Sequence, residues 1–164
     1  MLFWRIVDNK LHPVEEVKRL GFEEDDGLRI PDEYLEKQEF TVMRTCCGIG
    51  DWGIISAIPR LLKEKYPNCK VYIPSPILME KLFNGILTEK STWNNPFKNA
   101  NYIFENNPYV DGFKDYIVGE IFHDHYRVYN KEKKDIPLVK QMLKFWQFNE
   151  TEYSNCLPEL YFSD

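Results

Sequence analysis

The chain has 164 residues, of which 43% are hydrophobic and 15% aromatic, so it can form one domain with a sizeable core and is neither a disordered nor a collagen-like chain. No apolar run approaches the roughly 20 residues that span a bilayer, and the N-terminus lacks a signal-peptide core, so a cytoplasmic protein without a transmembrane segment is expected. The net charge of −5 lies within residues 1–40, because residues 41–164 carry 15 basic and 15 acidic side chains. Such a balanced domain has no basic surface for nucleic acid.

Residues 1–40 are predicted to form an acidic extension to the domain that follows. The turn residues Asp8 and Asn9, between two short apolar segments, predict a hairpin. Residues 12–21 predict a short helix that ends at a glycine, and the acidic run at 23–26 predicts a solvated loop. A partner or regulatory contact would be sought first in this extension.

The following segment alternates between strand and helix signals. Residues 40–46 are β-branched and largely apolar, which predicts a strand, and apolar residues at helical spacing predict a helix with Ser56 as its cap. A second strand is predicted over 70–73. Ser75 precedes a proline, which is typical of a helix N-cap and first position, and Ile77 belongs to the predicted buried face of that helix.

The second half of the chain has weaker signals. The Asn-rich residues 88–99 predict a loop, and residues 106–112 predict a turn. Strands are predicted over 100–104, 113–118 and 121–129. A last helix opening at Asp135 is predicted to bury Val139, Met142, Leu143 and Trp146.

Strands separated by helices predict a mostly parallel sheet, joined by right-handed crossovers and covered by helices on both faces. This describes an α/β, Rossmann-like domain over residues 41–164. In such domains, ligands bind at the carboxyl ends of the strands.

The cysteines are predicted to be reduced and mostly buried thiols. They form no Cys-x-x-Cys pair and have no histidine at zinc-finger spacing. Their positions are Cys46, Cys47, Cys69 and Cys156.

Three of the eight glycines, Gly48, Gly50 and Gly53, fall within six residues after the first domain strand. Glycines there leave room for a ligand, and free N–H groups at a helix start favour a phosphate or another anion. The spacing matches the dinucleotide fingerprint, which also requires an acidic residue at the end of the second strand. No acid follows that strand before Glu80, so a dinucleotide-binding enzyme remains a third hypothesis.

Further motifs follow in a consistent order. They are Gly50-Asp51, a helix with Pro59 and Leu62, Tyr66-Pro67, the strand 71–73, Asn107-Pro108-Tyr109-Val110-Asp111, and Pro158-Glu159-Leu160-Tyr161-Phe162. In this order they resemble the N-terminal domain of the heptosyltransferase-like glycosyltransferases (family 9), which have the two-domain GT-B fold. The resemblance covers roughly residues 41–164.

This resemblance implies inverting sugar transfer from a nucleotide-activated donor, with no metal and no further cofactor. The N-terminal domain would receive a sugar or glycolipid acceptor, and a C-terminal domain would hold the nucleotide sugar. Asp51 would act as general base on the acceptor hydroxyl. The predicted substrate-binding residues are Gly48, Gly50, Trp52 and Gly53.

The residues themselves leave alternatives open. Asp51 could instead cap a helix, and Trp52 could form an acceptor-facing wall or pack beneath the loop. Basic residues near this segment, such as Arg60 and Lys63, could attract an anionic acceptor or form a solvated helix face.

His123 and His125 stand two residues apart in a predicted strand, a spacing that can chelate a metal. No third ligand is identifiable in the sequence, and the resembled family needs no metal. No metal site is therefore expected.

Two functions from different classes rank above the dinucleotide hypothesis. The first is a glycosyltransferase acceptor domain, completed by a separate donor-binding domain or by a homo-oligomer. The second is a non-catalytic binding or assembly module that retains the fold without the donor domain. Saturable binding and turnover of nucleotide sugars would distinguish the two.

Overall fold

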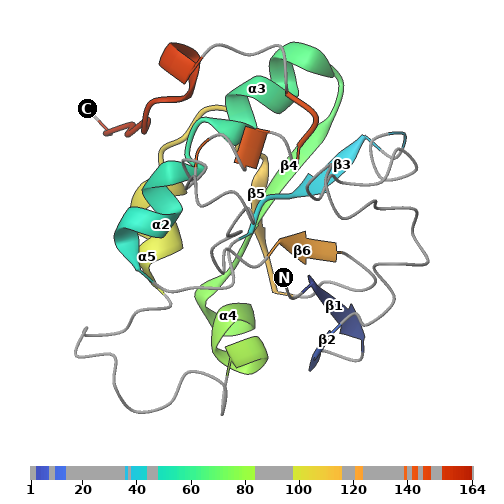
Figure 1. The fold of residues 1–164 in the computed structure, drawn as a ribbon. Coiled ribbons are helices and arrows are strands. Elements are labelled where there is room, and N and C mark those ends of the chain that lie inside the picture. Colours follow the sequence, from blue (N-terminus) through green and yellow to red (C-terminus); the bar gives the residue numbers. More distant parts are fainter. Residues whose placement is uncertain are drawn as a thin grey trace, which may run out of the picture.

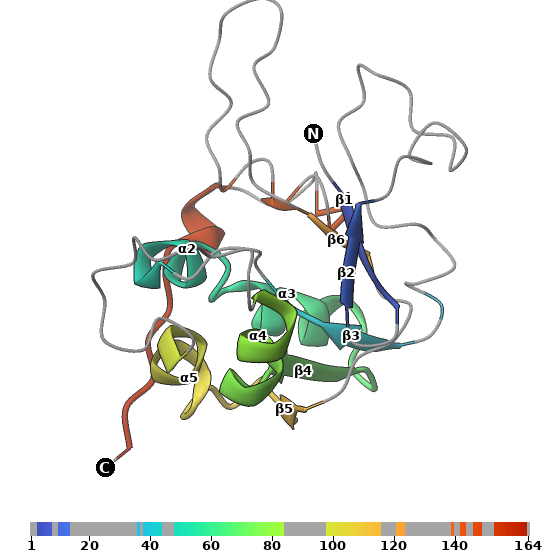
Figure 2. The ribbon, with the colours of Figure 1, turned by 90° about the horizontal axis from the view of Figure 1, so that it is seen from below.

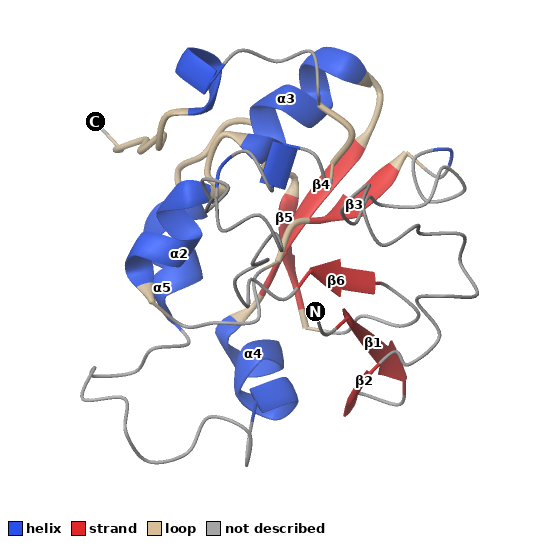
Figure 3. Cartoon of the chain, in the orientation of Figure 1, coloured by secondary structure: helices blue, strands red, loops and turns tan. Residues whose placement is uncertain are grey.

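A computed structural model gives the fold of the chain. It describes residues 3–7, 10–13, 36, 38–43, 48–83, 98–115, 121–123, 139, 142–143, 146–148 and 153–163. Within these ranges the chain forms two three-stranded sheets, with helices beside the parallel one (Figures 1 and 3). None of the helices in this part of the chain has the length and apolar character needed to span a membrane.

The parallel sheet has the strand order β3-β4-β5 and contains β3 (Glu39–Thr41), β4 (Lys70–Pro74) and β5 (Gly112–Lys114). Phe40 pairs with Val71, and Ile73 pairs with Phe113. The prediction of an α/β domain with a parallel sheet is confirmed at this coarse level. β3 is shorter than predicted, although Val42 N still donates to Tyr72 O at 2.9 Å, and residues 44–47 lie outside the described part.

Helices connect the parallel strands. Between β3 and β4 lie α2 (Ile49–Ile54) and α3 (Ile58–Lys65), and between β4 and β5 lie α4 (Pro76–Phe83) and α5 (Asn99–Phe104). Helices α2 and α5 lie side by side, as Figures 1 and 2 show. The first turns of α2 and α4 therefore follow the carboxyl ends of β3 and β4.

The second sheet is antiparallel, with order β2-β1-β6, and contains β1 (Phe3–Val7), β2 (Lys10–Pro13) and β6 (Ile121–His123). The predicted hairpin is present, since Val7 pairs with Lys10. His12 pairs with Arg5 and belongs to β2, so the predicted helix does not begin there. Residues 14–35, which include the rest of that helix and the acidic loop, lie outside the described residues.

The predicted boundary after residue 40 separates residues that share a sheet. β3 begins at Glu39, inside the predicted extension, and Trp4 of β1 pairs with Phe122 of β6. One strand of the hairpin, β1, thus pairs with β6, a strand of the main body. The N-terminal segment contributes to the fold through this pairing.

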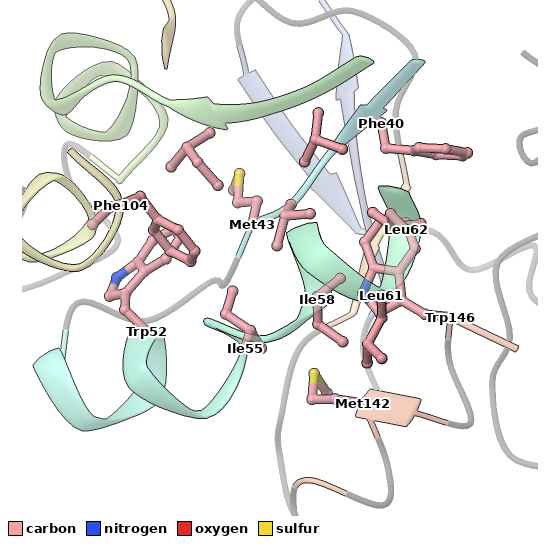
Figure 4. Packing of buried hydrophobic residues seen from close by; sticks show 14 of the residues in the cluster. Phe40, Met43, Trp52, Ile55, Ile58, Leu61, Leu62, Phe104, Met142 and Trp146 are labelled. Carbon is pink, nitrogen blue, oxygen red and sulfur yellow. The ribbon is translucent and has the colours of Figure 1, made fainter. Parts of the chain in front are cut away.

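One hydrophobic cluster joins the parallel sheet to its helices (Figure 4). Phe40 packs edge-on to Trp146, with ring centroids 6.1 Å apart. The predicted burial of Met142, Leu143 and Trp146 is confirmed, because all three belong to the cluster. Val139 packs against it in a partly buried position.

Two of the predicted buried thiols are also confirmed. Cys69 and Cys156 are buried and form no disulfide. Burial raises the pKa of both thiols, which disfavours the reactive thiolate. Cys46 and Cys47 lie outside the described residues.

Local signals around α4 and α5 gave mixed outcomes. The Ser75 cap is confirmed, because Leu78 N donates to Ser75 Oγ at 3.1 Å. Ile77 is 56% exposed and does not belong to the buried face, which is formed by Leu78 and Met79. The strand predicted over 100–104 is wrong: this segment is helix α5, with Ala100, Ile103 and Phe104 buried at helical spacing.

Candidate functional site

The glycine cluster begins a helix rather than forming an open loop. Gly48 is the N-cap of α2, with φ −68° and ψ 133°, so the backbone there does not require glycine. Asp51 N and Trp52 N donate to Gly48 O at 3.0 and 3.3 Å. Asp51 therefore lies in the first turn of α2, and the prediction that it could be the N-cap residue is wrong, because Gly48 holds that position.

The Asp51 carboxylate lies directly over Gly48. A Cβ atom added at Gly48 would stand 2.6 Å from Asp51 Oδ2, closer than non-bonded atoms pack. Asp51 is half-buried, and an acidic side chain in a first turn interacts favourably with the helix dipole. Glycine at position 48 thus makes room for the carboxylate in this orientation.

Gly50 and Gly53 have no such steric role. A Cβ at either position would meet nothing within 4 Å, and both residues lie inside α2. The close helix–strand packing that the third glycine of a dinucleotide fingerprint provides is therefore absent at Gly53. This geometry weakens the dinucleotide hypothesis.

The Gly48→Ala and Gly50→Ala variants form a matched pair. Gly50→Ala is expected to raise the free energy of unfolding by about 0.5–1 kcal/mol, because alanine favours a helix interior. Gly48→Ala is expected to give no such gain, because alanine is a poor N-cap residue and because the new methyl group must displace the Asp51 carboxylate. Urea unfolding of both variants measures the difference, and equal stabilisation would contradict the close approach of Asp51.

The side chain of Trp52 points into the core. It is 0% exposed, and its ring meets Phe104 of α5 in a T-shaped contact with centroids 6.2 Å apart (Figure 4). A side chain without exposed surface offers none to an acceptor. Trp52 therefore packs in the core and does not form an acceptor-facing wall. The prediction that Trp52 binds substrate is corrected.

Ser56 was predicted as a helix cap, but Ala57 is the N-cap of α3. Ser56 Oγ instead donates to Gly53 O at 2.6 Å and accepts a hydrogen bond from Glu159 N at 2.6 Å. The hydroxyl thus joins the end of α2 to a segment 103 residues further along the chain. No local pattern predicts this contact.

Arg60 lies in an ion-pair cluster and is not simply a solvated cation. Its Nε donates to Glu159 Oε1 at 2.7 Å and one amino group donates to Glu64 Oε1 at 2.8 Å. Burial alone would lower the pKa of Arg60, but the hydrogen bonds to both glutamates outweigh it and raise that pKa. Tyr161 Oη donates to Glu159 Oε2 at 2.8 Å, and burial together with this bond raises the pKa of Tyr161 to about 12.

Lys63 is likewise paired, with Asp111 at the end of the Asn-Pro-Tyr-Val-Asp segment. Asp111 accepts hydrogen bonds from Lys63 Nζ at 2.6 Å, Val71 N at 2.8 Å and Lys70 Nζ at 3.0 Å. Burial alone would raise the pKa of Asp111, but these three donors lower it to about 2. Asn107 Oδ1 accepts from Tyr109 N at 2.9 Å, which stabilises the predicted turn. This motif therefore stabilises the fold at the start of β4.

Of the two histidines, His123 lies in β6 opposite Phe3, whereas His125 lies outside the described residues. Among the described residues, no group of three or more histidine, cysteine or acidic side chains is arranged to hold a metal ion.

The structure thus brings Gly48, Asp51 and the Ser56–Glu159 contact together around one short helix and places Trp52 beneath it. Comparison with family models, curated proteins and solved structures finds no match to this chain.

Proposed function

We propose that this chain is the acceptor-binding domain of an inverting, heptosyltransferase-like glycosyltransferase, with Asp51 as general base. The proposal takes the α/β domain to be the Rossmann-like N-terminal half of a GT-B fold. It rests on the motif order in the sequence and on one structural observation. That observation is the half-buried Asp51 carboxylate in the first turn of the helix that follows β3.

Position supports this assignment. In parallel α/β sheets, ligands bind beyond the carboxyl ends of the strands, and α2 follows β3 on that side. Trp52, the residue after Asp51, is buried in the core. This burial restrains the backbone that carries the Asp51 carboxylate. A positioned base needs this kind of support.

In the proposed reaction, the Asp51 carboxylate accepts the proton of an acceptor hydroxyl. The hydroxyl oxygen forms a bond to the anomeric carbon of the donor sugar from the face opposite the nucleotide. The bond between that carbon and the phosphate oxygen breaks, and the nucleotide leaves with the electron pair. Binding of the nucleotide sugar is assigned to a second, donor-binding domain.

The test compares Asp51→Asn with Asp115→Asn, an exposed aspartate beyond β5. The protein is purified from its host, so that any separate donor-binding chain accompanies it, and is given a panel of nucleoside diphosphate sugars. Transfer by Asp51→Asn is expected to fall at least about a hundredfold, as loss of a general base does, while Asp115→Asn transfers normally. Equal transfer by both variants would reject the role of Asp51.

The second candidate is a non-catalytic binding or assembly module. One observation favours it: Leu157, Leu160 and Phe162 are exposed near the C-terminal end, and Phe162 is 83% exposed. Scattered exposed apolar residues are common on monomers, so this observation carries less weight than the position of Asp51. Absence of both nucleotide-sugar binding and transfer in the same assay would favour the module.

A further inference from the structure

Residues 158–162, called here the strap, lie against the junction of α2 and α3. Their exposure alternates, since Glu159 and Tyr161 are partly buried whereas Leu160 and Phe162 are exposed. The ring of Tyr161 meets that of Tyr109 at a centroid distance of 6.1 Å. The strap therefore has one face attached to the domain and one face directed outward.

The strap is attached to α2 through a single buried hydroxyl. Ser56 is 0% exposed, and its Oγ donates to Gly53 O and accepts from Glu159 N, both at 2.6 Å. Gly53 is in the last turn of α2, and its carbonyl also accepts from Ser56 N at 3.1 Å, so the hydroxyl is an additional donor to the end of that helix. Removal of the hydroxyl would leave Glu159 N without this acceptor.

The Glu159 carboxylate attaches the same strap to α3. Its two oxygens accept from Arg60 Nε at 2.7 Å and from Tyr161 Oη at 2.8 Å. Arg60 also donates to Asn155 O at 2.6 Å. The side chains of Arg60 and Glu159 are about one-fifth exposed, so this pair is less screened than a surface ion pair. The backbone N–H and the carboxylate of one residue therefore connect both helices.

Helix α2 needs such support, because a six-residue helix is not stable by itself. Trp52 packs against α5, Ile54 packs against the hydrophobic cluster, and Ser56 connects the last turn of α2 to the strap. We propose that the strap positions α2, and through it Asp51, with Ser56 and Glu159 as positioning residues. The consequence for Asp51 rests on the proposed function, whereas the control of α2 does not.

Amide hydrogen exchange followed by NMR tests the first part. The amides of Asp51 and Trp52, which bond to Gly48 O, report on α2, and those of Val42 and Met79 report on β3–β4 pairing and on α4. In Ser56→Ala and in Glu159→Ala, exchange of the α2 amides is expected to accelerate about tenfold relative to the two reference amides. Leu160→Ala, in the exposed face of the strap, is the matched control and is expected to change neither set. Ser56→Thr retains the hydroxyl and is expected to restore protection in α2.

Unchanged protection of α2 would overturn the proposal, and so would equal acceleration in α2 and at the reference amides, which indicates only a global loss of stability. Sugar transfer tests the link to Asp51: Ser56→Ala is expected to lower kcat with little change in the donor KM, and Ser56→Thr to recover it. A normal kcat in Ser56→Ala would overturn that link. The exchange experiment uses no sugar, so failure of Asp51→Asn to impair transfer would reject the proposed function and leave the positioning of α2 to be decided separately.

Discussion

Replacement of Trp52 by alanine is expected to lower the free energy of unfolding by about 3–5 kcal/mol, the range for truncating a large aromatic core residue. Among the described residues, Trp52 is the largest of the fully buried side chains, and its indole fills the space between α2 and α5 against Phe104. The alanine would leave a cavity there and remove the main apolar anchor of a short helix. Urea unfolding monitored by far-UV circular dichroism measures the loss.

Two further variants make this result specific. Trp52→Phe retains an aromatic ring against Phe104 and is expected to lose less than half as much stability as the alanine variant. Tyr102→Ala removes an aromatic side chain on α5 that is 64% exposed, and its unfolding free energy should stay within about 0.5 kcal/mol of the parent. A small loss in Trp52→Ala would contradict the buried position and return Trp52 to the acceptor-facing alternative.

Elements defined by neighbouring residues could be predicted from the sequence. The hairpin follows from turn residues between apolar strands, and the start of α4 follows from Ser75 before a proline, with the cap bond to Leu78 N observed. The strand over 70–73 is also correct, because its β-branched residues lie inside a parallel sheet and are buried. In each of these places the local signal and the tertiary environment favour the same structure.

Elsewhere, short signals were ambiguous. Residues 100–104 contain Tyr102, Ile103 and Phe104, which favour a strand by composition, yet burial of Ala100, Ile103 and Phe104 on one side selects a helix. Similarly, the sequence predicts a helix that begins only at Ser56, after the glycines at positions 48–53. The backbone forms a helix there, because Trp52 at its centre is buried against α5. Five or six residues carry too few periods to distinguish the two structures.

The candidate site is predictable only in part, for the same reason. Asp51 lies only three residues after Gly48, so their proximity follows from the first turn of a helix. The contact of Ser56 with Glu159 joins residues 103 positions apart, and that of Lys63 with Asp111 spans 48 positions. Long-range partners of this kind leave no periodic pattern, and a lysine on a helix face has the same appearance in sequence whether it is solvated or paired.

Asp111→Ala is expected to lower the free energy of unfolding by about 2–3 kcal/mol, because it leaves the N–H of Val71 without its acceptor and leaves Lys63 Nζ with Cys69 O. Asp111 N also donates to Val71 O at 2.7 Å. The backbone and the side chain of Asp111 therefore both bond to β4, at the residue just before β5. Urea unfolding measures this loss. Glu64→Ala is the control: Glu64 is an exposed partner of Arg60, so the variant's free energy of unfolding should fall by less than about 0.5 kcal/mol.

The loss of stability in Asp111→Ala should depend on pH. The pKa of Asp111 is about 2 in the folded chain against an ordinary value of 3.8, so its charge contributes stability that is fully present above pH 4 and is lost as the pH falls towards 2. With the side chain 19% exposed, that contribution is about 1–2 kcal/mol after screening. The difference in unfolding free energy between the parent and Asp111→Ala should therefore narrow between pH 5 and pH 2. A difference that stays constant over this interval would show that the Asp111 carboxylate is not held by Lys63 and Lys70.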